Sequence, residues 1–417
     1  MRLLLVIFAF VLMQSALNAQ RFVNPTWLNL GPKKASVGAY GYGSISSAEV
    51  TNSFLLNITK PEQLDAQVKS DQLANFKTSN NLVGGNYSLG LQGGFHLPNL
   101  CAGLVFNFSD EAHLSASFPG DLGKFVFDGN KQFAGREADF SRTSFNVLRY
   151  QKMGAGLNFE PAEDIKYGFI VSFLNGESTA SLNLNNGGVY TSLIGDSVSY
   201  NLRGTAFYSD TSNTGFFKHN GGGVAVDLFF SQRLDVFNER LQVSALLMNV
   251  GMIQWHPETE AYLVDTTVST RGIELNDLET AQSTINAYDL EDSLLGAITS
   301  GFSRATMNQV IPGFMQFEIS RVIDKGFDAG AGVTIRWQTI SRSYSWLNLG
   351  YRFSPGFMIK SELGYGGYGR FQAGLGAIYQ NEWFAANIRV ANLEAVVAPN
   401  KLGGITLGCG VQYFFGL

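Results

Sequence analysis

Five charged residues in the C-terminal part of the chain are the groups best suited to act on a solute. They are Arg336, Arg352, Lys360, Glu362 and Arg389. Each lies where polar and apolar residues alternate, so we expect all five on one face of neighbouring β-strands. If that face lines a lumen, the five side chains form a charged constriction that selects anionic or polar solutes. The alternative interpretation is structural, because paired charges with Gln and Asn side chains also fill the inside of a barrel.

Other patterns that could support catalysis or cofactor binding are weak. The sequence "GYGGYG" at Gly364–Gly369 matches a dinucleotide fingerprint, but no helix follows it, which indicates a hairpin turn. The acidic residues of Ile273–Ile298 lack the spacing of a calcium loop. No Ser-His-acid grouping can be inferred, and the four histidines form no ligand pair in the sequence: His96, His113, His219 and His256. We therefore expect no enzyme active site, metal or cofactor.

The composition is that of a protein whose outer surface is not in water. Of the 417 residues, 45% are hydrophobic and only 15% are charged, and there are 47 glycines. Ordinary soluble domains carry about 25% charged residues. After the N-terminal apolar run there is no second run of ~18 apolar residues, so we expect no membrane-spanning helix. The net charge of −5 is spread along the chain, which argues against a nucleic-acid partner.

The first residues of the chain resemble an export signal. Arg2 precedes the apolar run Leu3–Met13, and Ala19 before Gln20 marks a cleavage point, so residues 1–19 are predicted to be a signal peptide. Of the two cysteines, Cys101 shares parity with polar residues of its strand and Cys409 with apolar ones. We expect no disulfide between them, because side chains on opposite faces of a wall cannot bridge.

The final strand shows the pattern that most of the chain repeats. Apolar residues occupy every second position from Ile405 to Leu417, and small or polar residues lie between them. About fifteen such stretches follow one another with almost no helix, which predicts consecutive antiparallel strands. A soluble sandwich would hide the apolar face, whereas a membrane barrel turns it toward lipid. The last strand is about 40 Å long and, tilted by ~40°, covers the ~25 Å apolar band of an outer-membrane barrel.

The predicted fold class is therefore all-β, a transmembrane antiparallel β-barrel of about 14 strands, with 12 to 16 allowed. The barrel is expected at residues 81–417, with an acidic helical insert outside the cell at residues 273–298. Residues 20–80 are expected to form an N-terminal segment near or inside the lumen, a possible plug, with helical spacing in Pro61–Asn80. Turns counted back from the C-terminus are short on one side and longer on the other, at Asp110–Arg142, His256–Asn308 and Asn392–Gly403. This asymmetry predicts a periplasmic C-terminus in the cell outer membrane.

Five stretches of the chain resemble an uncharacterised outer-membrane barrel family of Bacteroidetes-type bacteria, a domain of unknown function within the FadL-like and PorV-like group. They are "NPTW" at Asn24–Trp27, "YGYGS" at Tyr40–Ser44, "FNVLRYQKMGAGLNF" at Phe145–Phe159, "NGGGVAVDLFF" at Asn220–Phe230 and "LLMNVGMIQW" at Leu246–Trp255. In the last stretch the family usually has an acidic residue where Asn249 stands. The resemblance implies a 14-stranded barrel with an N-terminal segment near the lumen, and it brings no active site.

Two functions remain open at this point. The first is passage of small molecules, including hydrophobic ones, through or sideways out of the lumen. The second is a non-transporting barrel that serves as a scaffold or accessory subunit of an outer-membrane or secretion complex. The expected partners are outer-membrane lipid and other outer-membrane or surface proteins.

Overall fold

The computed structural model describes residues 35–58, 65–97, 101–236, 239–271, 302–304, 306–323 and 326–416. The predicted signal peptide and the predicted acidic insert at residues 273–298 lie outside these ranges. No helix in the described part of the chain is long and apolar enough to cross a membrane.

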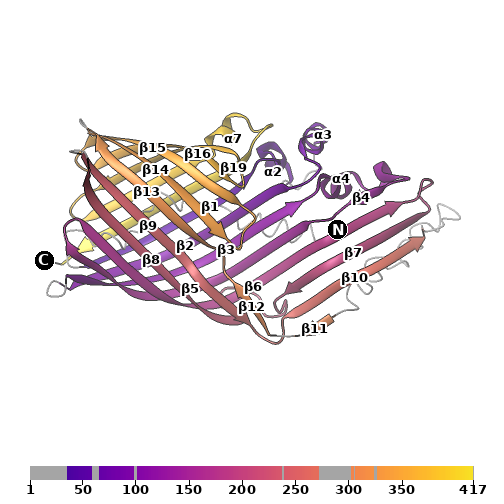
Figure 1. Cartoon of the computed structure of the whole chain (residues 1–417), viewed down its shortest axis with the longest axis horizontal. Helices are drawn as coiled ribbons and strands as arrows, with labels where there is room; N and C mark the ends of the chain where they lie inside the picture. Colours follow the sequence, from indigo (N-terminus) through magenta and orange to yellow (C-terminus); the bar gives the residue numbers. More distant parts are fainter. Residues whose placement is uncertain are drawn as a thin grey trace.

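Fourteen of the described strands form a closed antiparallel ring (Figure 1), which confirms the predicted fold class. Each strand pairs with the next in the ring, and β1 pairs on its other edge with β19. In ring order the strands are β1 (Ala35–Ser47), β2 (Asn81–Leu97), β3 (Ala102–Phe118), β5 (Thr143–Ala162), β6 (Ile165–Thr191), β8 (Gly221–Val236), β9 (Glu239–Trp255), β13 (Gly313–Ile323), β14 (Phe327–Trp337), β15 (Arg342–Ser354), β16 (Phe357–Gly367), β17 (Phe371–Gln380), β18 (Phe384–Ala391) and β19 (Gly403–Phe415).

The closing strand β1 corrects the predicted N-terminal segment. Residues 20–80 are predicted to lie near or inside the lumen, separate from the barrel strands, but Ala35–Ser47 is itself a strand of the wall and pairs with β19 along one edge and with β2 along the other. Its alternation is weak, because Tyr40 and Tyr42 point inward while the outer face mixes Val37, which is 52% exposed, with the small residues Ala39, Gly41 and Gly43. Gly90 of β2 makes room for this arrangement, because a Cβ there would lie 2.3 Å from the Tyr40 ring.

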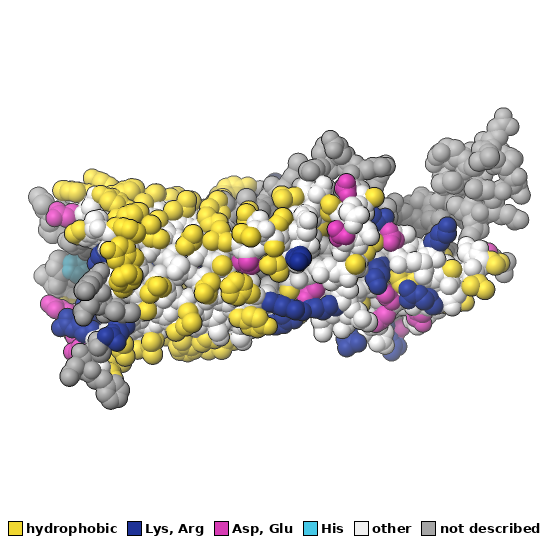
Figure 2. Space-filling model, turned by 90° about the horizontal axis from the view of Figure 1, so that it is seen from above, with side chains coloured by type: hydrophobic (Ala, Val, Ile, Leu, Met, Phe, Trp, Pro, Cys, Tyr) yellow, Lys and Arg dark blue, Asp and Glu magenta, His cyan; other side chains and the backbone are white. Residues whose placement is uncertain are grey.

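A belt of apolar side chains covers the outside of the ring. Ile405 and Val411 of β19 are 52% and 48% exposed, so the apolar face of the last strand points away from the lumen. Figure 2 shows hydrophobic side chains spread over this region, with charged residues mostly beyond it. Other members of the belt, each at least a third exposed, are Leu89, Leu91, Phe169, Val171, Phe173, Phe317, Ile319, Leu347, Leu349, Leu375 and Ile388. Apolar surface of this extent is stable against lipid and not against water.

One side of the barrel continues as a sheet beyond the ring (Figure 1). Strand β6 pairs with β8 inside the ring, and its second half pairs with β7 (Ser197–Tyr208), which pairs in turn with β10 (Glu260–Arg271). We call this extension the outer sheet. Short strands complete the structure: β4 (Glu137–Asp139), β11 (Phe302–Arg304) and β12 (Met307–Val310).

The lengths of β6 and β3 correct two predicted boundaries. The alternation in the sequence predicts separate strands at Ile165–Leu174 and Val189–Ile194 and a loop at Asp110–Arg142. The residues between the first two are rich in Gly, Asn and Ser, yet they stay extended because β5 and β7 satisfy their backbone hydrogen bonds. Strand β3 likewise runs on to Phe118, opposite Asn81 of β2.

The helices lie at one end of the ring, on its outer side. They are α2 (Asn52–Ile58), α3 (Ala66–Asn75), α4 (Gly120–Asp128), the 3-10 helix η3 (Lys131–Phe133) and α7 (Leu393–Val397). Phe54 of α2 is 2% exposed and packs in one cluster with the outward-facing Ile45, Val83 and Ala116. The predicted plug is therefore wrong for the described part of residues 20–80, because α2 and α3 cover apolar strand ends on the outer wall.

Candidate functional site

A buried ion pair lies in the middle of the lumen. Lys152 of β5 and Asp227 of β8 point inward and are 2% and 0% exposed, and Lys152 Nζ lies 2.6 Å from Asp227 Oδ2. The same Nζ donates to Asn249 Oδ1 at 2.5 Å. Asn249 lies at a bulge of β9 opposite Asp227, with φ of +60°, and its backbone N–H donates to Asp227 Oδ1 at 2.8 Å. The left-handed backbone of Asn249 thus lets side chains from β5, β8 and β9 meet at one ion pair.

A second polar group continues from Asn249 toward β3. Glu111 Oε2 accepts from the Tyr150 hydroxyl at 2.9 Å and from Asn249 Nδ2 at 3.2 Å. Ser109 Oγ donates to the other carboxylate oxygen at 2.9 Å, and His113 Nε2 lies 3.2 Å from the Tyr150 hydroxyl. Every polar group in this set has a partner, as a buried network requires.

Apolar side chains fill the lumen beside this network. One buried cluster consists of Leu148, Tyr150, Leu174, Ala225, Ile253, Trp255 and Ile311. A second consists of Val105, Ile170 and Phe229. The half of the lumen lined by β3 to β9 is therefore packed like a protein core, with these side chains at most 4% exposed.

The structure divides the five charged residues predicted to form a constriction. Glu362 and Arg389 lie 2.7 Å apart, 3% and 5% exposed, and Tyr344 donates to the same carboxylate at 3.0 Å. Lys360 Nζ lies 3.7 Å from Asp328 Oδ2. These three side chains thus form ion pairs with residues on nearby strands of the inner wall, as the structural interpretation expects.

The two remaining arginines lie far apart along the lumen. Arg352 is exposed near the short turn that joins β15 to β16. Arg336 is partly buried near the other end, with its guanidinium carbon 5.8 Å from the centre of the Phe314 ring. Within the described ranges, no carboxylate lies within ion-pair distance of Arg336. Of the five predicted constriction residues, it is the one that is partly buried and has no counter-ion among the described residues.

Two hairpin tips close the lumen above Arg336. Tyr368, between β16 and β17, donates from its hydroxyl to Ser115 Oγ at 2.8 Å, and the backbone N–H of Ile340, between β14 and β15, donates to the same oxygen at 3.1 Å. Tyr368 also lies against β2, where a Cβ on Gly84 would be 2.0 Å from its ring. Both tips thus turn inward and meet β3. We call residues 338–341 and 368–370 the lid.

The space directly under the lid is small. A cavity there is lined by Arg336, His113, Asn249, Tyr368 and neighbouring residues of β2, β5 and β13. The cavity has a volume of about 20 Å³, which is enough for one or two water molecules. The lid is therefore closed over this cavity in the structure.

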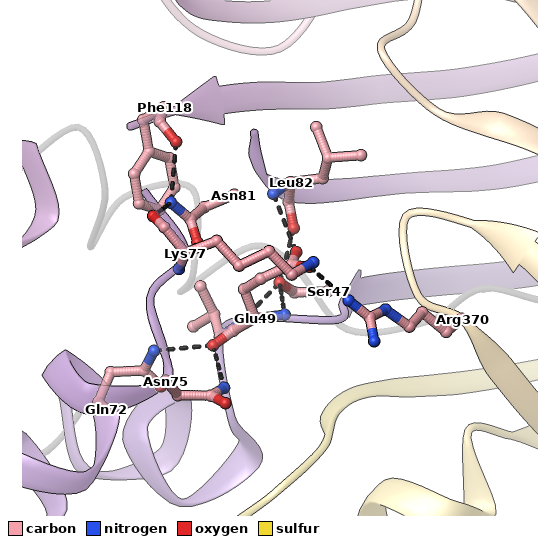
Figure 3. Close-up of polar contacts among 10 residues, drawn as sticks. Ser47, Glu49, Gln72, Asn75, Lys77, Asn81, Leu82, Phe118 and Arg370 are labelled. Atoms are coloured by element: carbon pink, nitrogen blue, oxygen red, sulfur yellow. Dashed lines mark hydrogen bonds and ion pairs between the residues drawn. The ribbon is translucent and has the colours of Figure 1, made fainter. Parts of the chain in front are cut away.

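The lid is tied to the rim of the barrel through Glu49 (Figure 3). Glu49 follows β1 and is 2% exposed, and its carboxylate accepts from Lys77 Nζ and, at 3.2 Å, from the backbone N–H of Leu82. Arg370 of the lid reaches the same carboxylate at 4.0 Å. The backbone carbonyl of Glu49 accepts from Asn75 Nδ2 at 2.6 Å, which fixes the end of α3. Through its carboxylate and its backbone carbonyl, the buried Glu49 therefore joins a lid tip, a barrel strand and a helix.

Sequence reasoning missed both the lid and the central ion pair. The "GYGGYG" stretch was correctly interpreted as a hairpin turn, and the large Tyr368 between two glycines was the available signal for a tip that folds inward. The structure also brings together His219 and His256, with ring centres 4.7 Å apart, although they are distant in sequence. Within the described residues no three or more His, Cys, Asp or Glu side chains are placed to hold a metal ion. Cys101 and Cys409 are free.

The chain matches one protein family in sequence and is distantly similar to several solved structures. The model of a family of unknown function, DUF5723, matches residues 35–387. No curated protein sequence matches the chain.

Solved structures that are similar to this one include a "TodX deltaS2S3 mutant monoaromatic hydrocarbon channel", 8% identical over 97% of this chain and 93% of that one, with a TM-score of 0.45. The Ralstonia pickettii toluene transporter TbuX is 8% identical over 97% and 92%, with a TM-score of 0.43. A Pseudomonas aeruginosa FadL homologue is 10% identical over 94% and 93%, with a TM-score of 0.41. The barrel fold follows from the pairing of its strands.

Proposed function

The chain belongs to the family of unknown function DUF5723, and on that premise we propose that it forms a gated outer-membrane channel for small molecules. In this proposal the lid end of the barrel faces the outside of the cell and the C-terminus faces the periplasm. The apolar belt supports the membrane placement, and the longer connections at the lid end support the orientation. Arg336, partly buried inside the lumen, suits a solute with a negative charge.

The proposal depends mainly on the position of Arg336. It lies under a lid that is held closed by hydrogen bonds. Burying a cation without a counter-ion is costly, and the other two partly or fully buried cations among the five predicted residues have carboxylate partners. The lid tips meet β3 through one hydroxyl, that of Ser115, and the other contacts of the lid are the Tyr368 ring against Gly84 and the 4.0 Å approach of Arg370 to Glu49. A small set of contacts therefore separates the closed state from an open one.

Conductance of the purified barrel in planar lipid bilayers tests the lid. We expect Tyr368→Ala to open the channel more often than the parent protein, because the substitution removes a hydrogen bond and the ring that fills the space beside Gly84. Tyr365→Ala is the matched control, since Tyr365 lies in the same hairpin but points outward and is 64% exposed. A Tyr368→Ala barrel that folds and stays as closed as the parent contradicts a lid.

The reversal potential in a salt gradient tests Arg336. We expect Arg336→Gln in the Tyr368→Ala background to shift the selectivity of the open channel away from anions. Arg352→Gln removes the same charge from the exposed end of the lumen and is expected to shift selectivity less. Equal shifts for the two substitutions mean that Arg336 does not form the constriction.

The outer sheet supports the second candidate, a scaffold, because β7 and β10 extend past the ring where another protein can reach them (Figure 1). The same bilayer measurement separates the two functions. A barrel that stays closed in every lid variant, and that loses a copurifying partner when residues 273–298 are deleted, favours the scaffold.

A further inference from the structure

A second cavity lies at the rim of the barrel, separate from the lumen. It has a volume of about 290 Å³ and lies between the lid, the end of β1, α3 and the connection from β18 to β19. Three basic side chains line it, and they come from distant parts of the chain: Lys77, Arg370 and Lys401. We call this cavity the rim pocket.

The basic side chains of the rim pocket have spare hydrogen-bond donors. Lys77 binds the buried Glu49 carboxylate, but Arg370 is 4.0 Å from it, which is beyond hydrogen-bond distance. Among the described residues, neither Arg370 nor Lys401 donates a side-chain hydrogen bond. The other carboxylate of the pocket, Glu394, already accepts from the backbone N–H of Ala373 at 2.7 Å. The rim pocket therefore has more positive than negative charge, and the Arg370 guanidinium, although near Glu49, and the Lys401 ammonium both keep hydrogen-bond donors for an anion.

Apolar side chains surround the rim pocket on its outer side. Phe371, which lines it, points away from the lumen and is 50% exposed. On α7, next to Glu394, Val396 and Val397 are 57% and 86% exposed. Phe371 begins β17, so this apolar surface continues into the lipid-facing belt at Leu375. Basic groups beside exposed aromatic and aliphatic groups at the edge of such a belt are typical of the level of lipid headgroups.

We propose that the rim pocket binds the phosphorylated headgroup of an acylated lipid in the outer leaflet. Arg370 and Lys401 hold a phosphate, while Phe371 and the exposed valines of α7 contact acyl chains. A soluble phosphate would use only the first set of groups, and it would leave the apolar surface beside the pocket uncovered. The inference depends on the proposed orientation, in which the lid end faces the outer leaflet.

Native mass spectrometry of the detergent-purified full chain tests this directly. The probe is hexa-acyl lipid A that carries two phosphates, titrated against the parent and against the double variant Arg370→Gln/Lys401→Gln. Each basic residue near an anionic surface contributes roughly tenfold or less, so we expect ~10- to 30-fold weaker binding by the double variant. The control is Arg233→Gln/Arg240→Gln, which removes the same charge from two exposed residues at the opposite end and is expected to bind like the parent.

Three results overturn the proposal. The first is equal binding of fully dephosphorylated lipid A, and the second is unchanged binding by the folded double variant. The third is displacement of lipid A by inorganic phosphate at similar concentration, which identifies a site for free anions. Heat-modifiable migration on a gel verifies that each variant is folded. Because bound lipid is read by its mass, a barrel that conducts nothing still gives an answer, so failure of the proposed channel is distinguishable from failure of this site.

Discussion

At the scale of single residues, the lumen of this barrel is organised by Lys152. Its ammonium group reaches over β6 to Asp227 and Asn249, which lie on two other strands. A buried ion pair contributes little net stability compared with an apolar pair, but removing one partner leaves the other charge buried and unpaired. The pair thus selects the bulged form of β9 over a regular strand, because only the bulge brings Asn249 to both charges.

Lys152→Met is expected to destabilise the barrel by about 3–5 kcal/mol, since it leaves Asp227 buried and unpaired. Urea unfolding of protein refolded into lipid vesicles measures this. The control is Lys166→Met, which breaks a half-exposed pair with Glu160 at 3.0 Å and should cost about 0–1 kcal/mol. Equal costs for the two variants, or no recovery in Lys152→Met/Asp227→Leu, contradict the role of the pair.

At the scale of elements, the loop between β7 and β8 marks where the apolar belt ends. Beneath it lie polar side chains on the outward face of the wall: Arg149 lies 3.1 Å from Asp110 Oδ2 and 2.9 Å from Glu177 Oε1. The loop covers these three charged side chains, and its Phe217 ring is stacked on Phe108 with 5.7 Å between the ring centres. Charges on an outward barrel face need such a cover, because lipid offers them no partner.

The same loop is expected to loosen at mildly acidic pH. Burial, together with the neighbouring His256 ring, lowers the pKa of His219 below its ordinary value of 6.5. A lowered folded-state pKa means that the neutral ring stabilises the loop above pH ~6.5, and this stabilisation is lost as pH falls through the lowered pKa. Asp210, in the same cavity, has a lowered pKa because of its hydrogen bonds to Ser212, so it titrates in a more acidic range.

Hydrogen–deuterium exchange of residues 209–220, corrected for the intrinsic effect of pH, measures the loosening between pH 7.5 and 5.5. His219→Gln should remove the pH dependence, whereas His96→Gln, in β2, should retain it. The loop hypothesis fails if exchange changes equally in the parent and in His219→Gln.

At the scale of the whole molecule, the surrounding medium decides which face of each strand is buried. The same alternation would give a soluble sandwich if the apolar face turned inward, but here that face forms the exposed belt and the lumen carries the polar network. Closure of fourteen strands removes every edge within the ring, which a spanning sheet requires because lipid cannot satisfy backbone hydrogen bonds.

Leu349→Arg, in the belt on β15, is expected to cost about 2–4 kcal/mol in vesicles, the cost of an arginine near the bilayer midplane. Leu193→Arg is the control, since Leu193 is 76% exposed in the connection from β6 to β7, beyond the ring. Leu193→Arg should cost almost nothing. Similar costs, measured by urea unfolding, contradict the position of the belt.

The alternation of apolar and polar residues determined the fold class, because a period of two assigns a face to each side chain without any knowledge of distant contacts. It also correctly placed Glu362 and Arg389 on the inner wall. It failed for β1, where large tyrosines occupy the inner face and small residues dilute the apolar outer face. It failed again within β6, where a polar sequence is held extended by β5 and β7.

Only the tertiary structure decided which charges meet. Parity puts Arg336, Arg352 and Lys360 on one face, but their heights in the barrel depend on strand tilt and register, which pair residues distant in the sequence. The lid, the Lys152–Asp227 pair and the rim pocket all join segments more than 70 residues apart. A local pattern specifies the direction of a side chain, and ring closure specifies its partner.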